Sequence, residues 1–163
     1  MLSEVKPQVY IDTSVLSYFT SKFSQNLKIA ARQLVTRDWW QNCQNKFDLV
    51  ASVLVVQEAR QGNPEEVKAR LDVLDTITTL ELSENALVLA ENLVDEGAIP
   101  LTAFEDALHI AIATTASEVE YLVSWNFRHI VNATMRPRIN AVCHKANYEP
   151  IIICTPEELM GDD

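Results

Sequence analysis

The stretch Val9-Tyr10-Ile11-Asp12-Thr13-Ser14-Val15-Leu16 decides the fold that we predict for this chain. Its first three residues are β-branched or aromatic, and they predict a short buried strand that ends at Asp12. An aspartate at that place either caps the next helix or serves as a functional carboxylate, and the stretch alone leaves both interpretations open. Ligands of open parallel α/β sheets bind beyond the carboxyl ends of the strands. The polar residues that follow the other strands therefore decide between the two interpretations.

Strands and helices alternate along the rest of the sequence. Further strands are predicted at residues 47–51, 121–123 and 151–153. Predicted helices start at five capping or first-turn residues, Asn26, Ser52, Pro64, Ser83 and Thr102, and a further helix is expected over residues 139–146. This alternation predicts an α/β fold with a central parallel sheet of about four to five short strands and helices on both faces. Residues 1–163 contain no repeat or linker, and we expect them to form a single domain.

The composition limits the classes of function. Acidic residues outnumber basic ones by 23 to 13, and the formal net charge is -10. Such a charge disfavours non-specific adhesion to DNA or anionic membranes, although bound metal ions reverse the field locally and leave room for a nucleic acid substrate. Three separated glycines exclude the usual phosphate-binding loops, and no apolar run approaches the ~20 residues of a membrane span, so no membrane partner is expected. Three cysteines without a CxxC pair predict reduced thiols and a cytoplasmic location.

Polar residues recur at places that an α/β fold brings to one edge of its sheet. Each follows a strand or lies on an adjoining helix: Asp12, Glu58, Asp106 and Asn126. Carboxylates that converge repel one another unless a cation lies among them, and hard oxygen donors without histidine or cysteine favour Mg²⁺ or Mn²⁺. Such an ion lowers the pKa of a bound water and neutralises charge on a phosphoryl group. The pattern therefore favours a metal-dependent phosphodiesterase.

Each of these residues also has an ordinary structural interpretation. Glu58 could pair with Arg60 or face the solvent, and Asp106 could simply favour the dipole of its helix. Asn126 could be a turn residue. His109 lies three residues after Asp106 on the same helical face, where a partly buried structural histidine is favoured over a metal ligand.

Four strings, read together, have the order and rough spacing of a known family. They are residues 9–16, Gln57-Glu58-Ala59, Asp106-Ala107-Leu108-His109-Ile110-Ala111 and Leu122-Val123-Ser124-Trp125-Asn126-Phe127. Together they resemble the PIN-domain family and, within it, the VapC-like toxins of type II toxin–antitoxin systems. The closing Ile152-Ile153-Cys154-Thr155-Pro156-Glu157-Glu158 looks like the ending of one PIN subgroup, so the resemblance spans nearly the whole chain.

The resemblance implies an endoribonuclease that depends on Mg²⁺ or Mn²⁺ and hydrolyses RNA phosphodiesters through in-line attack by a metal-activated water. Asp12, Glu58 and Asp106 would be the metal ligands, and Ser14 would lie beside the metal as a hydrogen-bonding group. The fourth catalytic position, often aspartate in the family, is Asn126 here. One firmly held ion is therefore expected, with a second arriving with the RNA phosphate. The family also implies a cognate antitoxin as partner, and a homodimer.

A non-enzymatic interpretation stays open beside this one. A PIN-fold protein of weak or absent activity could act as an RNA-binding or protein-interaction module, and the uncharged Asn126 supports that alternative. A haloacid-dehalogenase-like phosphatase is disfavoured, because its motif requires a second aspartate where this chain has Ser14.

The positive charges are unevenly distributed. Residues 13–37 and 121–148 each carry four basic residues and no acidic one. Lys28 and Arg32 are four residues apart on one helical face, and Arg128 closely follows Asn126, so we predict that these three hold RNA phosphates. The alternative is that they are ordinary solvated side chains. For Trp39 and Trp40, at a predicted helix end, we expect one core and one surface residue, with no base stacking.

Overall fold

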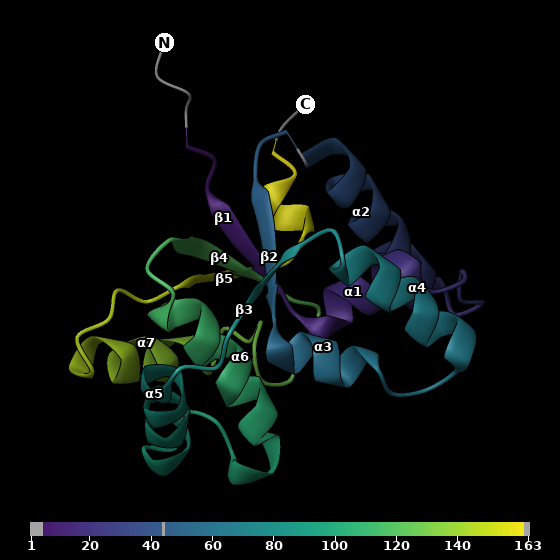
Figure 1. Cartoon of the computed structure of the whole chain (residues 1–163). Helices are drawn as coiled ribbons and strands as arrows, with labels where there is room; N and C mark the ends of the chain where they lie inside the picture. Colours follow the sequence, from purple (N-terminus) through teal and green to yellow (C-terminus); the bar gives the residue numbers. More distant parts are fainter. Residues whose placement is uncertain (1–4, 44, 162–163) are drawn as a thin grey trace.

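A five-stranded parallel sheet forms the centre of the molecule, in the order β3-β2-β1-β4-β5 (Figure 1). The structure is a computed structural model that describes residues 5–43 and 45–161. The strands are β1 (Gln8–Ile11), β2 (Asp48–Ser52), β3 (Thr78–Leu80), β4 (Val119–Val123) and β5 (Ile152–Cys154). The predicted α/β class and parallel sheet are confirmed. Three of the four predicted strands overlap closely with observed ones, whereas β4 begins two residues before the prediction.

The first strand occupies the middle of the sheet, because its apolar residues are covered on both faces. Val9, Tyr10 and Ile11 are fully buried, and Tyr10 pairs with Val50 on one side and Leu122 on the other. The chain runs outward from β1 to β2 and β3, and then returns to place β4 on the opposite side of β1. A reversal of this kind leaves a crevice at the carboxyl ends of the two diverging strands. Asp12 and Ser124 directly follow those two strands.

The described residues form seven α-helices around the sheet. They are α1 (Thr13–Thr20), α2 (Leu27–Cys43), α3 (Val53–Ala59), α4 (Pro64–Leu74), α5 (Glu84–Asp95), α6 (Phe104–Thr115) and α7 (Arg136–Lys145), with short 3₁₀ turns η1 (Leu101–Ala103) and η2 (Glu157–Leu159). Figure 1 shows α5, α6 and α7 gathered on one side and α1, α2 and α4 on the other. In the described part of the chain, no helix is long and apolar enough to cross a membrane.

Local capping signals predicted most helix starts correctly. The side chains of Asn26, Ser52 and Ser83 each accept backbone N–H groups of the following turn, as expected for N-caps. Thr102 was predicted wrongly, because it lies inside η1 and α6 begins at Phe104 without a side-chain cap. Gly62, which lies just beyond the end of α3, adopts φ +109°, a conformation that favours glycine.

Two elements were not predicted. The helix α1 starts directly after Asp12, whose side chain accepts the N–H of Val15 as an N-cap. The strand β3 is a three-residue edge strand with two exposed threonines, so it lacks the apolar run by which buried strands are identified.

The expectation for the tryptophan pair was wrong. Both Trp39 and Trp40 are buried, and the Trp40 ring stacks on Phe19 with centroids 4.2 Å apart. The buried side of α2 also includes Gln33 and Thr36. The Trp40 ring therefore packs against α1, and neither buried ring is available to a nucleic acid base.

A buried arginine fixes the end of α3, the helix that carries Glu58. The Arg70 guanidinium on α4 is 7% exposed and donates to the carbonyl oxygens of Ala59, at 3.1 Å, and Gln61, at 2.6 Å. These carbonyls lie at and just beyond the helix end, where backbone acceptors lack intrahelical donors. Arg70 therefore joins α4 to the segment that positions Glu58.

We predict that Arg70→Met lowers the free energy of unfolding by about 2 kcal/mol, because the buried Ala59 carbonyl and the partly buried Gln61 carbonyl lose a charged donor while the aliphatic stem is kept. Urea denaturation measures the loss. Arg60→Met is the matched control, since Arg60 is exposed and its removal should change stability by less than about 0.5 kcal/mol. Equal losses in the two variants would contradict a capping role for Arg70.

Candidate metal and phosphodiester site

The carboxylate of Asp12 is buried, at 3% exposure, and its partners among the described residues are hydrogen-bond donors. Oδ1 accepts the Ser14 hydroxyl at 2.6 Å and the Val15 N–H at 3.2 Å, and Oδ2 accepts the Ser124 hydroxyl at 2.5 Å. The two interpretations of Asp12 are thus compatible, because the residue caps α1 and also lies at the β1–β4 crevice. Ser14 donates to this carboxylate, and its place beside a metal stays a prediction.

The same two serines hold the loop that follows β4. Ser14 Oγ accepts the Trp125 N–H, and Ser124 Oγ accepts the Asn126 N–H, both at 2.9 Å. Each hydroxyl therefore donates to Asp12 and accepts from the loop backbone. The role of Ser124 was not predicted, although it lies within one of the quoted strings, because its contact with Asp12 spans 112 residues of sequence.

Glu58 on α3 is held by a histidine on α6. Its Oε1 lies 2.5 Å from His109 Nε2 on α6 and accepts the Thr13 hydroxyl at 3.2 Å. His109 is 3% exposed, and its Nδ1 lies 2.7 Å from the Tyr10 hydroxyl, which lies 2.7 Å from Ser52 Oγ. Both ring nitrogens thus have protein partners. His109 is the buried structural histidine that the sequence favoured, and it orients Glu58.

Asp106 on α6 is held in a similar way. Its Oδ2 lies 2.9 Å from Nδ1 of His129, which belongs to the loop after β4. Sequence reasoning assigned nothing to His129, because a single histidine in a loop carries no spacing signal. With the Asp12 bonds, this contact fixes the loop to two of the three predicted acids.

The side chain of Asn126 closes the loop on itself. Its Oδ1 accepts the backbone N–H groups of Arg128 and His129, both at 3.1 Å. An amide oxygen has two lone pairs, and both are used by these donors. The turn interpretation of Asn126 therefore holds in this structure, and a metal-ligand role would require the loop to release a donor.

Burial and neighbouring charge shift three pKa values at the site. Burial raises the pKa of Asp12, although nearby His109 and the bonds from Ser124, Ser14 and Val15 counteract it. The pKa of His109 is also raised: burial lowers it, but the Glu58 hydrogen bond and the charges of Asp12, Glu58 and Asp106 more than compensate. Burial raises the pKa of the Tyr10 hydroxyl as well. All three predicted acids therefore act on one imidazole, which favours its cationic form.

The acids surround this crevice without forming a ready-made ligand cage. In residues 5–43 and 45–161, no group of three or more His, Cys, Asp or Glu side chains lies close enough to hold a metal ion. Within the same residues, the oxygens Glu58 Oε2 and Asp106 Oδ1 accept no protein hydrogen bond. Two free carboxylate oxygens beside a buried carboxylate are hard donors suited to Mg²⁺ or Mn²⁺.

The predicted basic residues differ in their surroundings. Arg32 reaches the loop after β4, where its guanidinium carbon lies 4.8 Å from the Phe127 ring centroid. Lys28 and Arg128 are exposed. In the described chain, none of these three forms an ion pair with a carboxylate.

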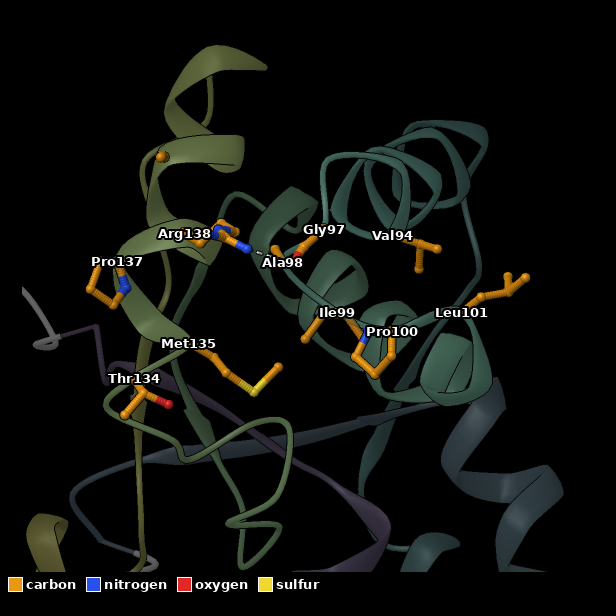
Figure 2. A pocket seen from close by; sticks show the side chains of 11 residues that line it. Val94, Gly97, Ala98, Ile99, Pro100, Leu101, Thr134, Met135, Pro137 and Arg138 are labelled. Carbon is orange, nitrogen blue, oxygen red and sulfur yellow. Dashed lines mark hydrogen bonds between the residues drawn. The ribbon is translucent and has the colours of Figure 1, made fainter.

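Two hollows differ in their chemistry. A hollow of about 510 Å³ beside η1 and the start of α6 is lined by Asp106, Glu105 and His129 among others. A larger, mainly apolar hollow lies between the end of α5 and the start of α7 (Figure 2). There Arg138 donates to the Gly97 carbonyl at 3.2 Å, and no acidic side chain lines the hollow. Of these two hollows, the first adjoins one predicted acid, Asp106, and Asp12 and Glu58 line neither.

The cysteines offer no alternative chemistry. Burial raises the pKa of the Cys143 thiol to about 11 and that of the Cys154 thiol to about 12. Nucleophilic cysteines instead have lowered pKa values and partial exposure.

Comparison with solved structures addresses the fold. The chain is similar to a chain in the crystal structure of VapBC2 from Rickettsia felis bound to a DNA fragment from their promoter, with a TM-score of 0.57 over 91% of this chain and 98% of that chain. The fold is PIN-like. The identity is 13%, so the likeness concerns the fold alone. The sequence matches no family model and no curated protein.

The raised pKa of Asp12 makes stability depend on pH. A carboxyl with a raised pKa binds its proton more tightly when folded, so its contribution is favourable at acid pH and is lost as pH rises above the unfolded value. We predict that Asp12→Asn raises the Tm at pH 7 in metal-free buffer by a few degrees, since each kcal/mol moves the Tm by about 2–4 °C. The difference from wild type should shrink towards acid pH. Thermal scans across pH measure it.

Asp48→Asn is the control, because Asp48 is an exposed carboxylate at the start of β2. An Asp12→Asn variant that is less stable than wild type at pH 7 would show that the charged form is favoured by its hydrogen bonds.

Proposed function

We propose that this protein is an endoribonuclease that depends on Mg²⁺ or Mn²⁺ and acts as the toxin of a type II toxin–antitoxin pair. The observation that carries the proposal is the placing of three acids around His109: Glu58 contacts its imidazole, Asp106 lies three residues before it on α6, and buried Asp12 ends β1, whose Tyr10 also contacts the imidazole. Acids from separate elements that lie around one site repel one another, and a bound cation would relieve that repulsion more fully than the imidazole alone. The PIN-like fold supports the same activity by analogy.

The protein groups have separate roles in this proposal. Asp12, Asp106 and Glu58 would hold the ion, which when bound would supply positive charge for the phosphate and a more acidic water. His109 and Thr13 hold Oε1 of Glu58, which leaves Oε2 to accept a hydrogen bond from the attacking water. Ser14 and Ser124 orient Asp12. Asn126 keeps the loop closed, and its neutral side chain is consistent with one firmly held ion.

The toxin role rests on the family resemblance and on the similar structure. That structure is of VapBC2, and the motifs of this chain resemble those of VapC-like toxins. We therefore propose an antitoxin as partner, RNA as substrate, a homodimer and a cytoplasmic location. The acidic remainder of the surface suits a cationic partner segment.

A second candidate is a PIN-fold module that binds RNA or protein without cutting. One observation favours it: Glu58 and Asp106 are each paired with a histidine, and Asn126 Oδ1 has both lone pairs used. A site closed in this way could lack metal affinity altogether.

We predict that the wild-type chain cleaves members of an RNA panel with Mg²⁺ or Mn²⁺ and does not cleave them in EDTA. Asp12→Asn and Asp106→Asn should each reduce kcat/KM by roughly 100-fold or more, because each loses charge stabilisation worth several kcal/mol. Mn²⁺ should also raise the Tm of wild type but not of Asp106→Asn.

Glu105→Gln is the matched control, since it removes the same charge from an exposed neighbour on α6 and should leave cleavage unchanged. Undiminished cleavage by the Asp12→Asn, Asp106→Asn double variant would refute the assignment. RNA binding without cleavage, and without a metal-induced rise in Tm, would favour the non-catalytic module.

A further inference from the structure

The loop after β4 presents an exposed aromatic ring next to the acidic crevice. Phe127 is 42% exposed, although its chain neighbours are tied inward: Trp125 N–H donates to Ser14, and His129 contacts Asp106. Ser14 in turn donates to Asp12. The ring therefore lies on a loop segment that is bonded to Asp106 on one side and, through Ser14, to Asp12 on the other.

The ring rests on a rigid base. Trp125 is buried, and its indole N–H donates to the Thr36 hydroxyl on α2 at 2.8 Å. The Phe127 ring meets Trp125 edge to face, with centroids 6.1 Å apart and an interplanar angle of 63°. An aromatic ring on an anchored support loses little conformational freedom when it binds a ligand.

A cation without a carboxylate partner covers the same ring. The Arg32 guanidinium carbon lies 4.8 Å from the Phe127 centroid and 5.9 Å from that of Trp125. No hydrogen bond or ion pair to the Arg32 guanidinium occurs among the described residues, and residues 13–37 contain no acid. Lys28 and Arg128, both exposed, lie one helical turn before Arg32 and directly after Phe127.

A second arginine–phenylalanine pair provides a useful contrast. Arg37 lies 3.9 Å from the Phe23 ring centroid, but its guanidinium also donates to the carbonyl oxygens of Phe19 and Ser21. Those bonds hold the segment that joins α1 to α2, so that pair has a structural role. The Arg32–Phe127 pair has no such carbonyl contacts in the described chain.

We propose that Phe127 and Arg32 form a stacking site for one unpaired base of a single-stranded RNA whose backbone crosses the acidic crevice. The inference rests on the proposed nuclease function and adds its substrate class. An aromatic face stacks on any base, and a planar guanidinium stacks as well while attracting phosphate. Lys28 and Arg128 provide positive charge for the adjacent phosphates. Bases of a duplex are stacked internally and cannot reach the ring, so the site selects single strands.

The test measures binding separately from cleavage. The probe is a fluorescein-labelled RNA of roughly 12 nucleotides and mixed sequence, within the usual span of single-strand sites, in EDTA. Fluorescence anisotropy of the full chain should give about 10-fold weaker binding for Phe127→Leu, which keeps apolar bulk but removes the aromatic face. Phe127→Trp should bind at least as tightly as wild type. Phe23→Leu is the matched control and should leave Kd unchanged.

Two further measurements separate stacking from a general structural effect. When abasic nucleotides are placed along the probe, one position should weaken wild-type binding, and Phe127→Leu should add no further loss there. Arg32→Gln should weaken binding and reduce the slope of log K against log salt by about 0.7, the value for one lost phosphate contact on a single strand. This variant also keeps the test decisive if Phe127→Leu unfolds.

Failure of the stacking site is distinguishable from failure of the nuclease. If the protein cuts RNA but Phe127→Leu binds the probe like wild type, or loses equal affinity for a duplex of the same sequence, the stacking site is wrong and the nuclease stands. If no metal supports cleavage but binding depends on Phe127, the stacking site stands. If Phe127→Leu alters only self-association in sedimentation, the surface is a protein interface and the proposal is overturned.

Discussion

The buried carboxylate of Asp12 is the constraint on which the rest of the site depends. A charge removed from water is tolerated only when donors surround it, and here the Ser14 and Ser124 hydroxyls and the Val15 N–H fill that role. The serines come from α1 and from the segment after β4, and each also accepts an N–H of the loop that follows. One carboxylate thus joins the central strand, the first helix and the loop. Burial of this charge costs free energy, and the same burial allows one carboxylate to hold these three segments together.

The other two acids are balanced by imidazoles. Glu58 pairs with His109 and Asp106 with His129, so each carboxylate has one oxygen occupied by a protein partner. The second oxygen of each carboxylate is oriented by its histidine pair but accepts no hydrogen bond from the described residues. A metal ligand should be oriented in this way before the ion binds. Tyr10 and Ser52 extend the His109 contact into the core. Positions far apart in sequence therefore support one another around a single buried ring.

Particular elements explain where sequence reasoning succeeded and failed. The caps Asn26, Ser52 and Ser83 were identified because the capping interaction lies within three residues of its helix. The strand β3 was missed because an exposed edge strand needs no apolar run. Trp39 and Trp40 were misjudged because packing of α2 against α1, rather than the apolar pattern of α2 itself, decides which of its faces is covered. That packing leaves Leu27 and Leu34 exposed while it buries Gln33.

By itself, the sequence determined the α/β class, the parallel sheet and the candidate acids Asp12, Glu58 and Asp106, because periodicity and strand-end residues are local signals. Only the tertiary structure decided how those acids are held. The partners Ser124, His109 and His129 are separated from them by 112, 51 and 23 residues. It also decided that Asn126 closes its own loop and that the Arg32 guanidinium lies over the partly exposed Phe127 ring. These contacts arise where segments distant along the chain meet at the β1–β4 crevice, and no pattern within a single segment encodes such a meeting.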